Sequence, residues 1–182
     1  MNLKKIVVIG PESTGKSWLC EKLAAYYNIN WVKEYAREYL LANGKEYTLN
    51  DLTLIAKGQL ENENRIADQI LYRFESVDAK KPLFIDTDLY VMKVWSEFVF
   101  NQCSFEILNS IVKHHYDLYL LCKPDIPWVS DELREYPDLM TREKLFHHYK
   151  DIMINQSVPW IEISGSFENR FQMAIQAVDQ LL

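Results

Sequence analysis

The sequence of 182 residues lacks two features that are typical of secreted and membrane proteins, a disulfide framework and a long apolar run. It has three cysteines, Cys20, Cys103 and Cys122, whose odd number and scattered positions argue against a disulfide framework and against C-x-x-C metal-ligand spacing. No stretch approaches the ~20 consecutive apolar residues of a membrane-spanning helix. We therefore expect a cytoplasmic protein that has no membrane partner and needs neither disulfides nor metals to fold.

The sequence is also short of positive charge. Its 20 Lys and Arg residues are outnumbered by 26 Asp and Glu residues, for a net charge of −6, and no basic cluster indicates a positively charged face. A nucleic-acid partner would require such a face. A few local cations and backbone amides are enough to bind a small anion, so the charge balance favours a small-molecule substrate and no nucleic acid.

Apolar segments and helical patterns alternate along the chain, which predicts a parallel sheet flanked by helices. The length is that of one domain, spanning 1–182. The expected α/β fold has about five strands, at 4–9, 29–32, 83–85, 116–122 and 160–164. Helices are expected at 16–28, 51–77 with Asn50 as its cap, 88–100 and 104–115, with another starting near Thr141.

The run GPESTGKS lies between the first expected strand and the first expected helix, as a phosphate-binding loop requires. Its backbone N–H groups would face the phosphates of ATP, Lys16 would reach the β- and γ-phosphates, and the Ser17 hydroxyl would bind Mg²⁺. The alternative is a plain glycine turn. The predicted nucleotide-binding residues of this loop are Gly10, Pro11, Glu12, Ser13, Thr14, Gly15, Lys16 and Ser17.

Phosphoryl transfer also needs an acid near the metal and the attacking hydroxyl. Asp86 and Asp88 follow the buried strand at 83–85, and the carboxyl ends of parallel strands share one edge with the phosphate loop. We expect Asp86 to serve the metal and the hydroxyl. Asp88 either shares this site or caps the next helix.

Two further segments carry candidate substrate contacts. In WVKEYAREYL, Glu34 and Arg37 share a helical face, where they form either an ordinary surface ion pair or part of a site, and Trp31 offers a flat ring. The proline-rich, irregular segment near 123–143 is a candidate lid. Its arginines, Arg134 and Arg142, would either stabilise a transferring phosphoryl group or lie solvated on the surface.

Five motifs in order resemble the ribosylnicotinamide kinase domain of NadR-type proteins: GPESTGKS, EYAREY, FIDTD, PWVSDELR and IEISGSFENRF. The resemblance spans nearly the whole chain. It implies a P-loop kinase fold and the ATP- and Mg²⁺-dependent phosphorylation of the ribose 5′-hydroxyl of N-ribosylnicotinamide, giving nicotinamide mononucleotide for NAD synthesis. The alternative is a P-loop kinase of another nucleoside or small metabolite. NadR-type proteins also carry an adenylyltransferase domain, but the H-x-G-H pattern is absent here, so we expect the product to be the mononucleotide.

The resemblance also implies roles for individual residues. Glu34 and Arg37 match the substrate side, and Trp128, Asp131 and Arg134 match the lid. Arg170 falls where such kinases flank the adenine. The family has a tryptophan directly before the EY pair, whereas this chain has Lys33 there, so Trp31 and Trp128 are alternative partners for the nicotinamide ring. Either Asp86 or Glu34 would accept the hydroxyl proton, and the oligomeric state is left open.

Overall fold

A parallel sheet of four strands forms the centre of the computed structural model, which describes residues 3–74 and 80–182. The strands are β1 (Leu3–Ile9), β2 (Lys81–Asp86), β3 (Leu118–Cys122) and β4 (Trp160–Ile163), in the order β2-β1-β3-β4. In the central strand, Ile6 pairs with Phe84 on one side and with Leu118 on the other. The expected parallel α/β fold is confirmed.

The expected strand at 29–32 is reduced to a single bridge. Val32 pairs with Ile85, its N–H donates to the carbonyl of Phe84, and its own carbonyl accepts from the N–H of Asp86. The chain then turns into α2 (Tyr35–Asn43), so one residue rather than four adds to the sheet edge. This is why the sheet has four strands and not five.

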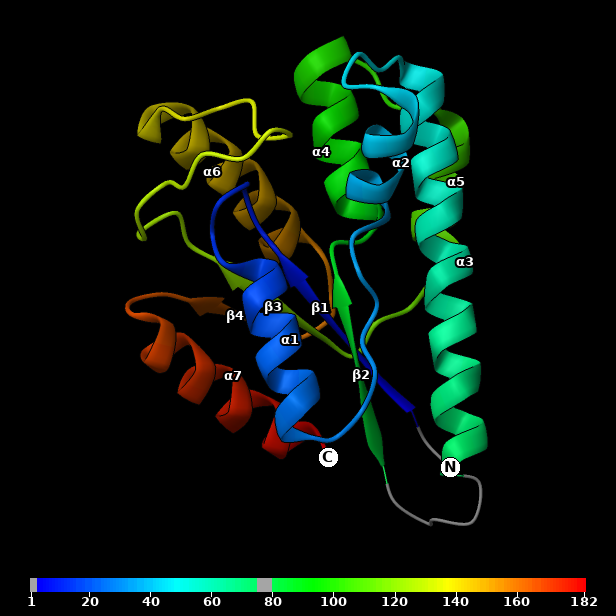
Figure 1. The fold of residues 1–182 in the computed structure, drawn as a ribbon, viewed down its shortest axis with the longest axis vertical. Coiled ribbons are helices and arrows are strands. Elements are labelled where there is room, and N and C mark those ends of the chain that lie inside the picture. Colours follow the sequence, from blue (N-terminus) through cyan, green and yellow to red (C-terminus); the bar gives the residue numbers. More distant parts are fainter. Residues whose placement is uncertain (1–2, 75–79) are drawn as a thin grey trace.

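The central strand is buried on both faces, and its side chains alternate between two apolar clusters. Ile6 and Val8 pack with α1 (Lys16–Tyr26) and α7 (Phe167–Leu181). Val7 and Ile9 pack in the opposite cluster, which α3 (Leu49–Arg73), α4 (Leu89–Phe100), α5 (Phe105–Lys113) and α6 (Leu139–Asn155) complete. Continuous β-branched residues suit a strand covered by helices on both sides. Figure 1 shows these layers.

Side-chain caps set where several helices begin. Thr48 and Asp51 form a reciprocal capping box at the start of α3, in place of the expected cap at Asn50. Asp88 caps α4 and Asp138 caps α6. The last residues of the helix expected to reach 77 lie outside the described part of the chain.

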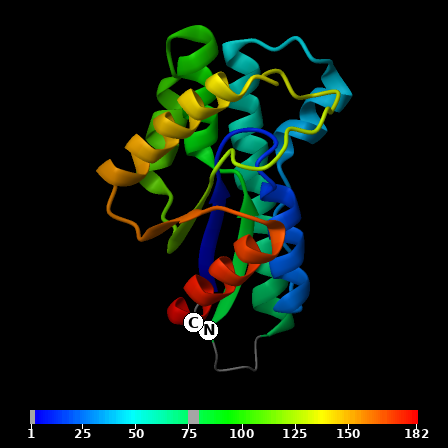
Figure 2. The ribbon, with the colours of Figure 1, turned by 90° about the vertical axis from the view of Figure 1, so that its left-hand side faces the viewer.

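The segment 123–138 between β3 and α6 has no regular helix or strand. Two perpendicular views show it passing over the phosphate loop on its way to α6 (Figures 1 and 2). We call this segment the lid. Within the described residues, none of the helices combines the length and apolar character needed to cross a bilayer.

Candidate active site

The phosphate loop joins β1 to α1 and lies against the end of β3. A Cβ on Gly10 would lie 2.5 Å from the carbonyl oxygen of Cys122, so only glycine allows this close approach. The Thr14 hydroxyl and the Lys16 ammonium both donate to the carbonyl of Pro11, each at 2.8 Å. The loop ends at the amino end of α1, where free backbone N–H groups favour the binding of an anion.

Asp86, the last residue of β2, is almost fully buried beside this loop. Its Oδ1 has no hydrogen-bond partner among the described residues. The pKa of Asp86 is raised to about 7, first by burial and then by the negative charge of Glu34, against the opposing effects of Lys16 and the Ser17 side chain. A buried carboxylate oxygen without a donor is costly, so this atom is suited to a cation or a proton donor supplied by a ligand.

Glu34 is held at the start of α2 by a residue that sequence analysis missed. The buried side chain of Gln59 accepts from the N–H of Tyr35 at 2.8 Å and donates to the carbonyls of Asp86 and Thr87 at 3.4 and 3.1 Å. Gln59 thus links the backbone next to Glu34 with the backbone of Asp86. A glutamine in the middle of an amphipathic helix carries no sequence signal for this role.

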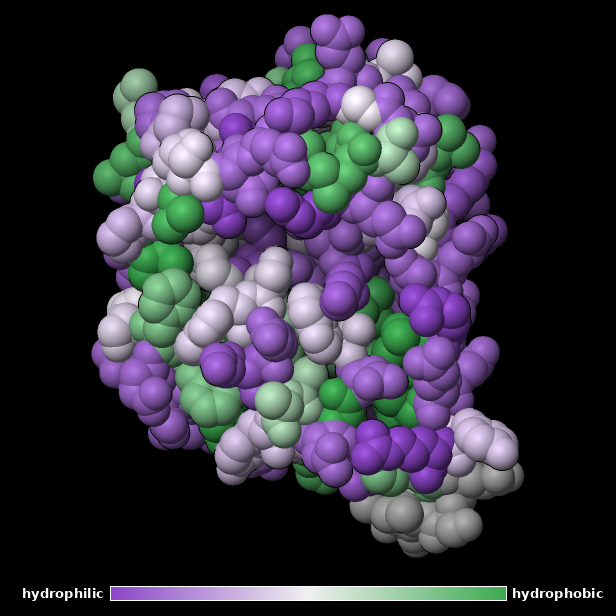
Figure 3. Space-filling view, viewed as in Figure 1, coloured by the Kyte–Doolittle hydropathy of each residue, from purple (hydrophilic) through white to green (hydrophobic). Residues whose placement is uncertain are grey.

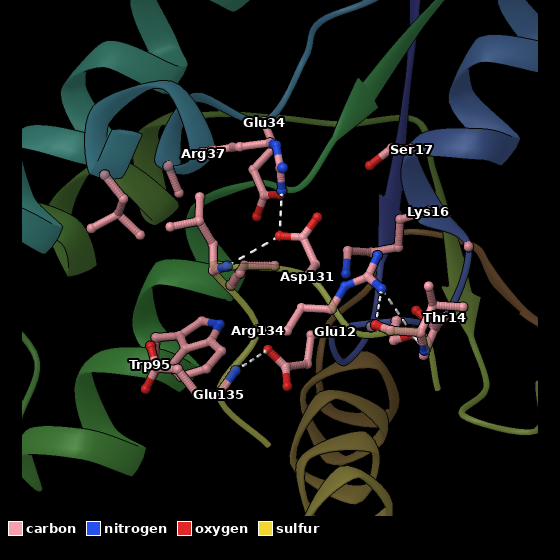
Figure 4. Close-up of a pocket in the computed structure, with 18 of the residues that line it drawn as sticks. Glu12, Thr14, Lys16, Ser17, Glu34, Arg37, Trp95, Asp131, Arg134 and Glu135 are labelled. Atoms are coloured by element: carbon pink, nitrogen blue, oxygen red, sulfur yellow. Dashed lines mark hydrogen bonds and ion pairs between the residues drawn. The ribbon is translucent and has the colours of Figure 1, made fainter. Parts of the chain in front are cut away.

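The lid is hydrogen-bonded to the phosphate loop. The carboxylate of Glu12 accepts from the backbone N–H groups of Glu135 and Tyr136. The Ser13 hydroxyl accepts from the N–H of Val129 at 3.0 Å and from Arg134 Nη1 at 3.3 Å. Arg134 thereby lies at the phosphate loop, as Figure 4 shows.

The lid also contacts α2. Arg37 Nη1 lies 2.8 Å from Asp131 Oδ1, and this hydrogen bond lowers the pKa of Asp131 to about 2. Both side chains are partly exposed, so the pair contributes at most about 1 kcal/mol to stability. Arg37 therefore pairs across the cavity with the lid rather than with Glu34 along its own helix.

These elements enclose a cavity of about 730 Å³. Trp18, Ile126 and Phe167 line it next to Gly15, and the rings of Trp18 and Phe167 are 4.6 Å apart. Apolar side chains on α3 and α4, with Tyr47, line another part: Leu52, Ile55, Val91, Met92 and Trp95. Lys16, Ser17, Glu34, Arg37 and Arg134 also line the cavity. The face seen in Figure 3 is hollowed near its middle, with mostly hydrophilic residues around the opening.

Seven predicted site residues are not among those that line this cavity: Pro11, Trp31, Asp86, Asp88, Trp128, Arg142 and Arg170. The Asp88 carboxylate caps α4 by accepting from the N–H of Tyr90 at 3.0 Å, and it also accepts from the Tyr119 hydroxyl at 2.8 Å. Arg142 is buried in the first turn of α6, where its Nε and Nη1 have no partner among the described residues. The structure thus gives Asp88 its capping alternative rather than a place beside Asp86.

Arg170 braces the site from behind. Its buried guanidinium donates to the carbonyls of Gly165, Thr14 and Lys123 at 2.8, 3.1 and 2.9 Å, and it pairs with Asp125. These contacts tie α7 to the phosphate loop and to the end of β3. Arg170 was expected to flank the adenine. Its side chain is instead buried at the start of α7, where it donates hydrogen bonds to backbone carbonyls.

The two tryptophans expected to hold an acceptor ring also lie outside the cavity lining. Trp31 is partly buried against the cluster formed with α1 and α7. The Trp128 indole N–H is buried without a partner among the described residues. Trp18 and Trp95 are the tryptophans that line the cavity in the part of the chain described.

The fold and the phosphate loop define a P-loop protein with the α/β architecture of nucleoside and nucleotide kinases. The chain belongs to the AAA domain family AAA_28, which matches residues 5–170. It is also similar to the trifunctional NAD biosynthesis/regulator protein NadR of Escherichia coli (strain K12). That relative is 24% identical over 185 residues, which cover 99% of this chain and 43% of the relative.

Solved structures share the fold. A crystal structure of NadR protein in complex with NR has a TM-score of 0.77 and 24% identity, and the match covers 98% of this chain and 49% of that one. A thymidylate kinase from Ehrlichia chaffeensis has a TM-score of 0.67 and 13% identity, covering 98% and 100%. The chain spans about half the length of the NadR proteins that it matches.

Proposed function

We propose that this protein transfers the γ-phosphoryl group of ATP to the ribose 5′-hydroxyl of N-ribosylnicotinamide and releases nicotinamide mononucleotide and ADP. The observation that carries the proposal is the buried Oδ1 of Asp86 at the edge of the sheet beside the phosphate loop, which has no hydrogen-bond partner within residues 3–74 and 80–182. Glu34, which lines the cavity, is close enough to the buried Asp86 to raise its pKa.

The donor side of the cavity suits ATP with Mg²⁺. The phosphate loop and the start of α1 offer backbone N–H groups to the phosphates, and Trp18 and Phe167 offer apolar rings nearby. The Ser17 hydroxyl and the Asp86 carboxylate are hard oxygen ligands of the kind that Mg²⁺ prefers. A bound Mg²⁺ would neutralise charge on the phosphates.

The residues of this chain would then have separate roles in the reaction. The acceptor oxygen forms a bond to the γ-phosphorus while the bond from that phosphorus to the β–γ bridging oxygen breaks, and the hydroxyl proton passes to a carboxylate. Lys16 and Arg134 would stabilise charge on the transferring group. Asp86 and Glu34 are the two carboxylates placed to orient the hydroxyl and receive its proton.

The acceptor is proposed from the similarity to NadR proteins, one of which has been solved in complex with NR. Glu34 and Arg37, which the sequence motifs assign to the substrate side, line the cavity together with Asp131, which they assign to the lid and which is far away in the sequence. Their meeting across the lid supports a closed acceptor site.

The proposal is tested by measuring ADP release and product mass with ATP, Mg²⁺ and a panel of nucleosides: N-ribosylnicotinamide, uridine, thymidine and adenosine. We expect N-ribosylnicotinamide to have the highest kcat/KM. A Lys16→Ala preparation purified in parallel controls for contaminating kinases. Good turnover of another nucleoside with none of N-ribosylnicotinamide would contradict the proposal.

A kinase acting on a different nucleoside or small metabolite is the second candidate. It is favoured by the fold shared with a thymidylate kinase over 98% of this chain. The same panel separates the two, because they share the donor site and differ only in the acceptor.

A further inference from the structure

A tryptophan that lines the acceptor side of the cavity packs against a tyrosine of the lid, and the motifs singled out neither residue. Trp95, on α4, lines the cavity beside Met92, one helical turn earlier. Its ring lies 5.6 Å from that of the lid residue Tyr136, at an angle of 40°, and Phe98 packs edge-on behind Tyr136 at 5.4 Å. A half-buried indole that reaches a ligand cavity offers a flat face at little entropic cost.

Trp95 is the candidate for contacting an acceptor ring because the other tryptophans considered for this role do not line this side of the cavity. Lys33 occupies the place where NadR-type domains have a tryptophan, and it is exposed. Trp31 packs into the core, and neither it nor Trp128 lines the cavity. Trp18 lies beside Phe167 at the opposite, nucleotide side. Figure 4 shows Trp95 on the side of the cavity away from Thr14 and Ser17.

The acidic residues that line the cavity, Glu12, Glu34, Asp131 and Glu135, outnumber the basic ones, Lys16, Arg37 and Arg134, by four to three. Glu34 and Glu135 line the same cavity, and the Tyr47 hydroxyl donates to Glu135 at 3.1 Å. Arg37 is already paired with Asp131. A cationic ring in this space would meet the π face of an indole and nearby carboxylates, whereas a neutral ring would gain only the contact area.

We propose that Trp95, backed by Tyr136, is the residue that selects a planar cationic ring on the acceptor, in place of the tryptophan that this chain lacks before Glu34. This inference rests on the proposed function for the identity of the acceptor. Tyr136 is part of the lid and its N–H donates to Glu12 of the phosphate loop. The ring site is therefore completed only when the lid contacts the nucleotide side.

The test compares Trp95→Leu, which keeps an apolar side chain but removes the ring, with Trp95→Phe, which keeps a smaller ring. Trp160→Leu, at the start of β4, is the matched control. We expect Trp95→Leu to raise the KM for N-ribosylnicotinamide by about tenfold to thirtyfold. The KM for ATP should stay within about twofold, and Trp95→Phe should recover part of the loss.

A second readout does not depend on turnover. A pyridinium ring stacked on indole gives a charge-transfer absorption band at wavelengths beyond those of tryptophan. Titration with N-ribosylnicotinamide should produce this band in the wild type and in Trp160→Leu but not in Trp95→Leu. The neutral dihydro form of the nucleoside, which cannot act as the electron acceptor, should give no band.

These measurements separate the two proposals. A wild type that phosphorylates N-ribosylnicotinamide, with an unchanged KM and an intact band in Trp95→Leu, overturns the role of Trp95 and leaves the proposed function standing. Loss of the band in Trp31→Leu instead would also overturn it. A wild type that phosphorylates no nucleoside but shows a band that depends on Trp95 would support the ring site and contradict the kinase.

Discussion

The ring of Tyr35 occupies the space where a side chain on Gly58 would be. A Cβ built on Gly58 lies 2.1 Å from Tyr35 Cε1 and 2.5 Å from Cζ, so α2 can pack this closely only on a glycine. Tyr35 follows Glu34 directly, and the neighbouring Gln59 binds the Tyr35 N–H. The contact therefore sets the position of a carboxylate that faces the candidate site.

Gly58→Ala should consequently reverse the usual preference for alanine in helices. An exposed Gly→Ala change in a helix interior stabilises by up to about 1 kcal/mol, but overpacking against the ring should destabilise by about 1 to 3 kcal/mol. Urea unfolding measures the difference, with Asn64→Ala at an exposed position of α3 as the control. We also expect a lower kcat because Glu34 shifts. A more stable Gly58→Ala protein would show that Tyr35 moves aside freely.

Lys16→Ala should abolish most phosphoryl transfer while the fold persists. The ammonium contacts a loop carbonyl and lines the cavity rather than packing in the core, so its loss removes charge stabilisation. We expect kcat to fall by about a hundredfold or more, with a melting temperature close to that of the wild type. Lys22→Ala, exposed on the same helix, should keep full activity. Activity retained in Lys16→Ala would rule out the assigned role.

Asp86→Asn and Glu34→Gln separate the two candidate carboxylates. Asparagine keeps the shape of Asp86 but is a poorer ligand for a cation and a poorer proton acceptor, so kcat should fall by about a hundredfold or more while the KM for ATP changes less. Glu34→Gln should act mainly through the acceptor if Asp86 receives the proton. Single-turnover rates measured at saturating ATP distinguish these outcomes. A normal kcat in Asp86→Asn would exclude its assignment.

The buried carboxyl of Glu63 predicts how stability depends on pH. Burial raises its pKa from 4.5 to about 8, partly offset by Lys5 and by the Tyr116 hydroxyl, which donates to it at 3.1 Å. The folded chain then binds more protons than the unfolded chain between these values. Its unfolding free energy should fall with rising pH, with a contribution of up to about 1.4 kcal/mol per pH unit.

Glu63→Gln should remove that contribution. Urea unfolding at about pH 5.5 and about pH 8.5 should show a smaller loss of stability in this variant than in the wild type. Glu61→Gln, exposed on the same helix, should keep the wild-type dependence. Parallel pH profiles for the wild type and Glu63→Gln would show that Glu63 is ionised in the folded protein.

The features that local sequence could predict are those whose cause is local. The phosphate loop depends on residues that are adjacent in the chain, and the central strand is a continuous β-branched run. Asp86 could be placed beside the loop because parallel strands end at one edge, and the two strands are indeed paired at Val8 and Asp86. These three predictions required no knowledge of contacts between residues that are distant in the sequence.

The rest depended on contacts between distant residues. Asp88 and Arg170 are charged residues near the active edge of the sheet, and both are buried in the fold. Asp88 caps α4, and Arg170 donates to backbone carbonyls. The bond from Tyr136 to Glu12 joins residues 124 positions apart. Trp95 sits in a helix of largely apolar residues, where the sequence cannot separate a ligand contact from core packing.

One cavity is lined both by Phe167, on the side proposed for the nucleotide, and by Trp95, on the side proposed for the acceptor. An inhibitor with two flat rings joined by a phosphate chain could therefore span it. Such a bisubstrate compound would compete with ATP and with the nucleoside at once, and its affinity would exceed that of either fragment, since a single molecule loses translational freedom only once.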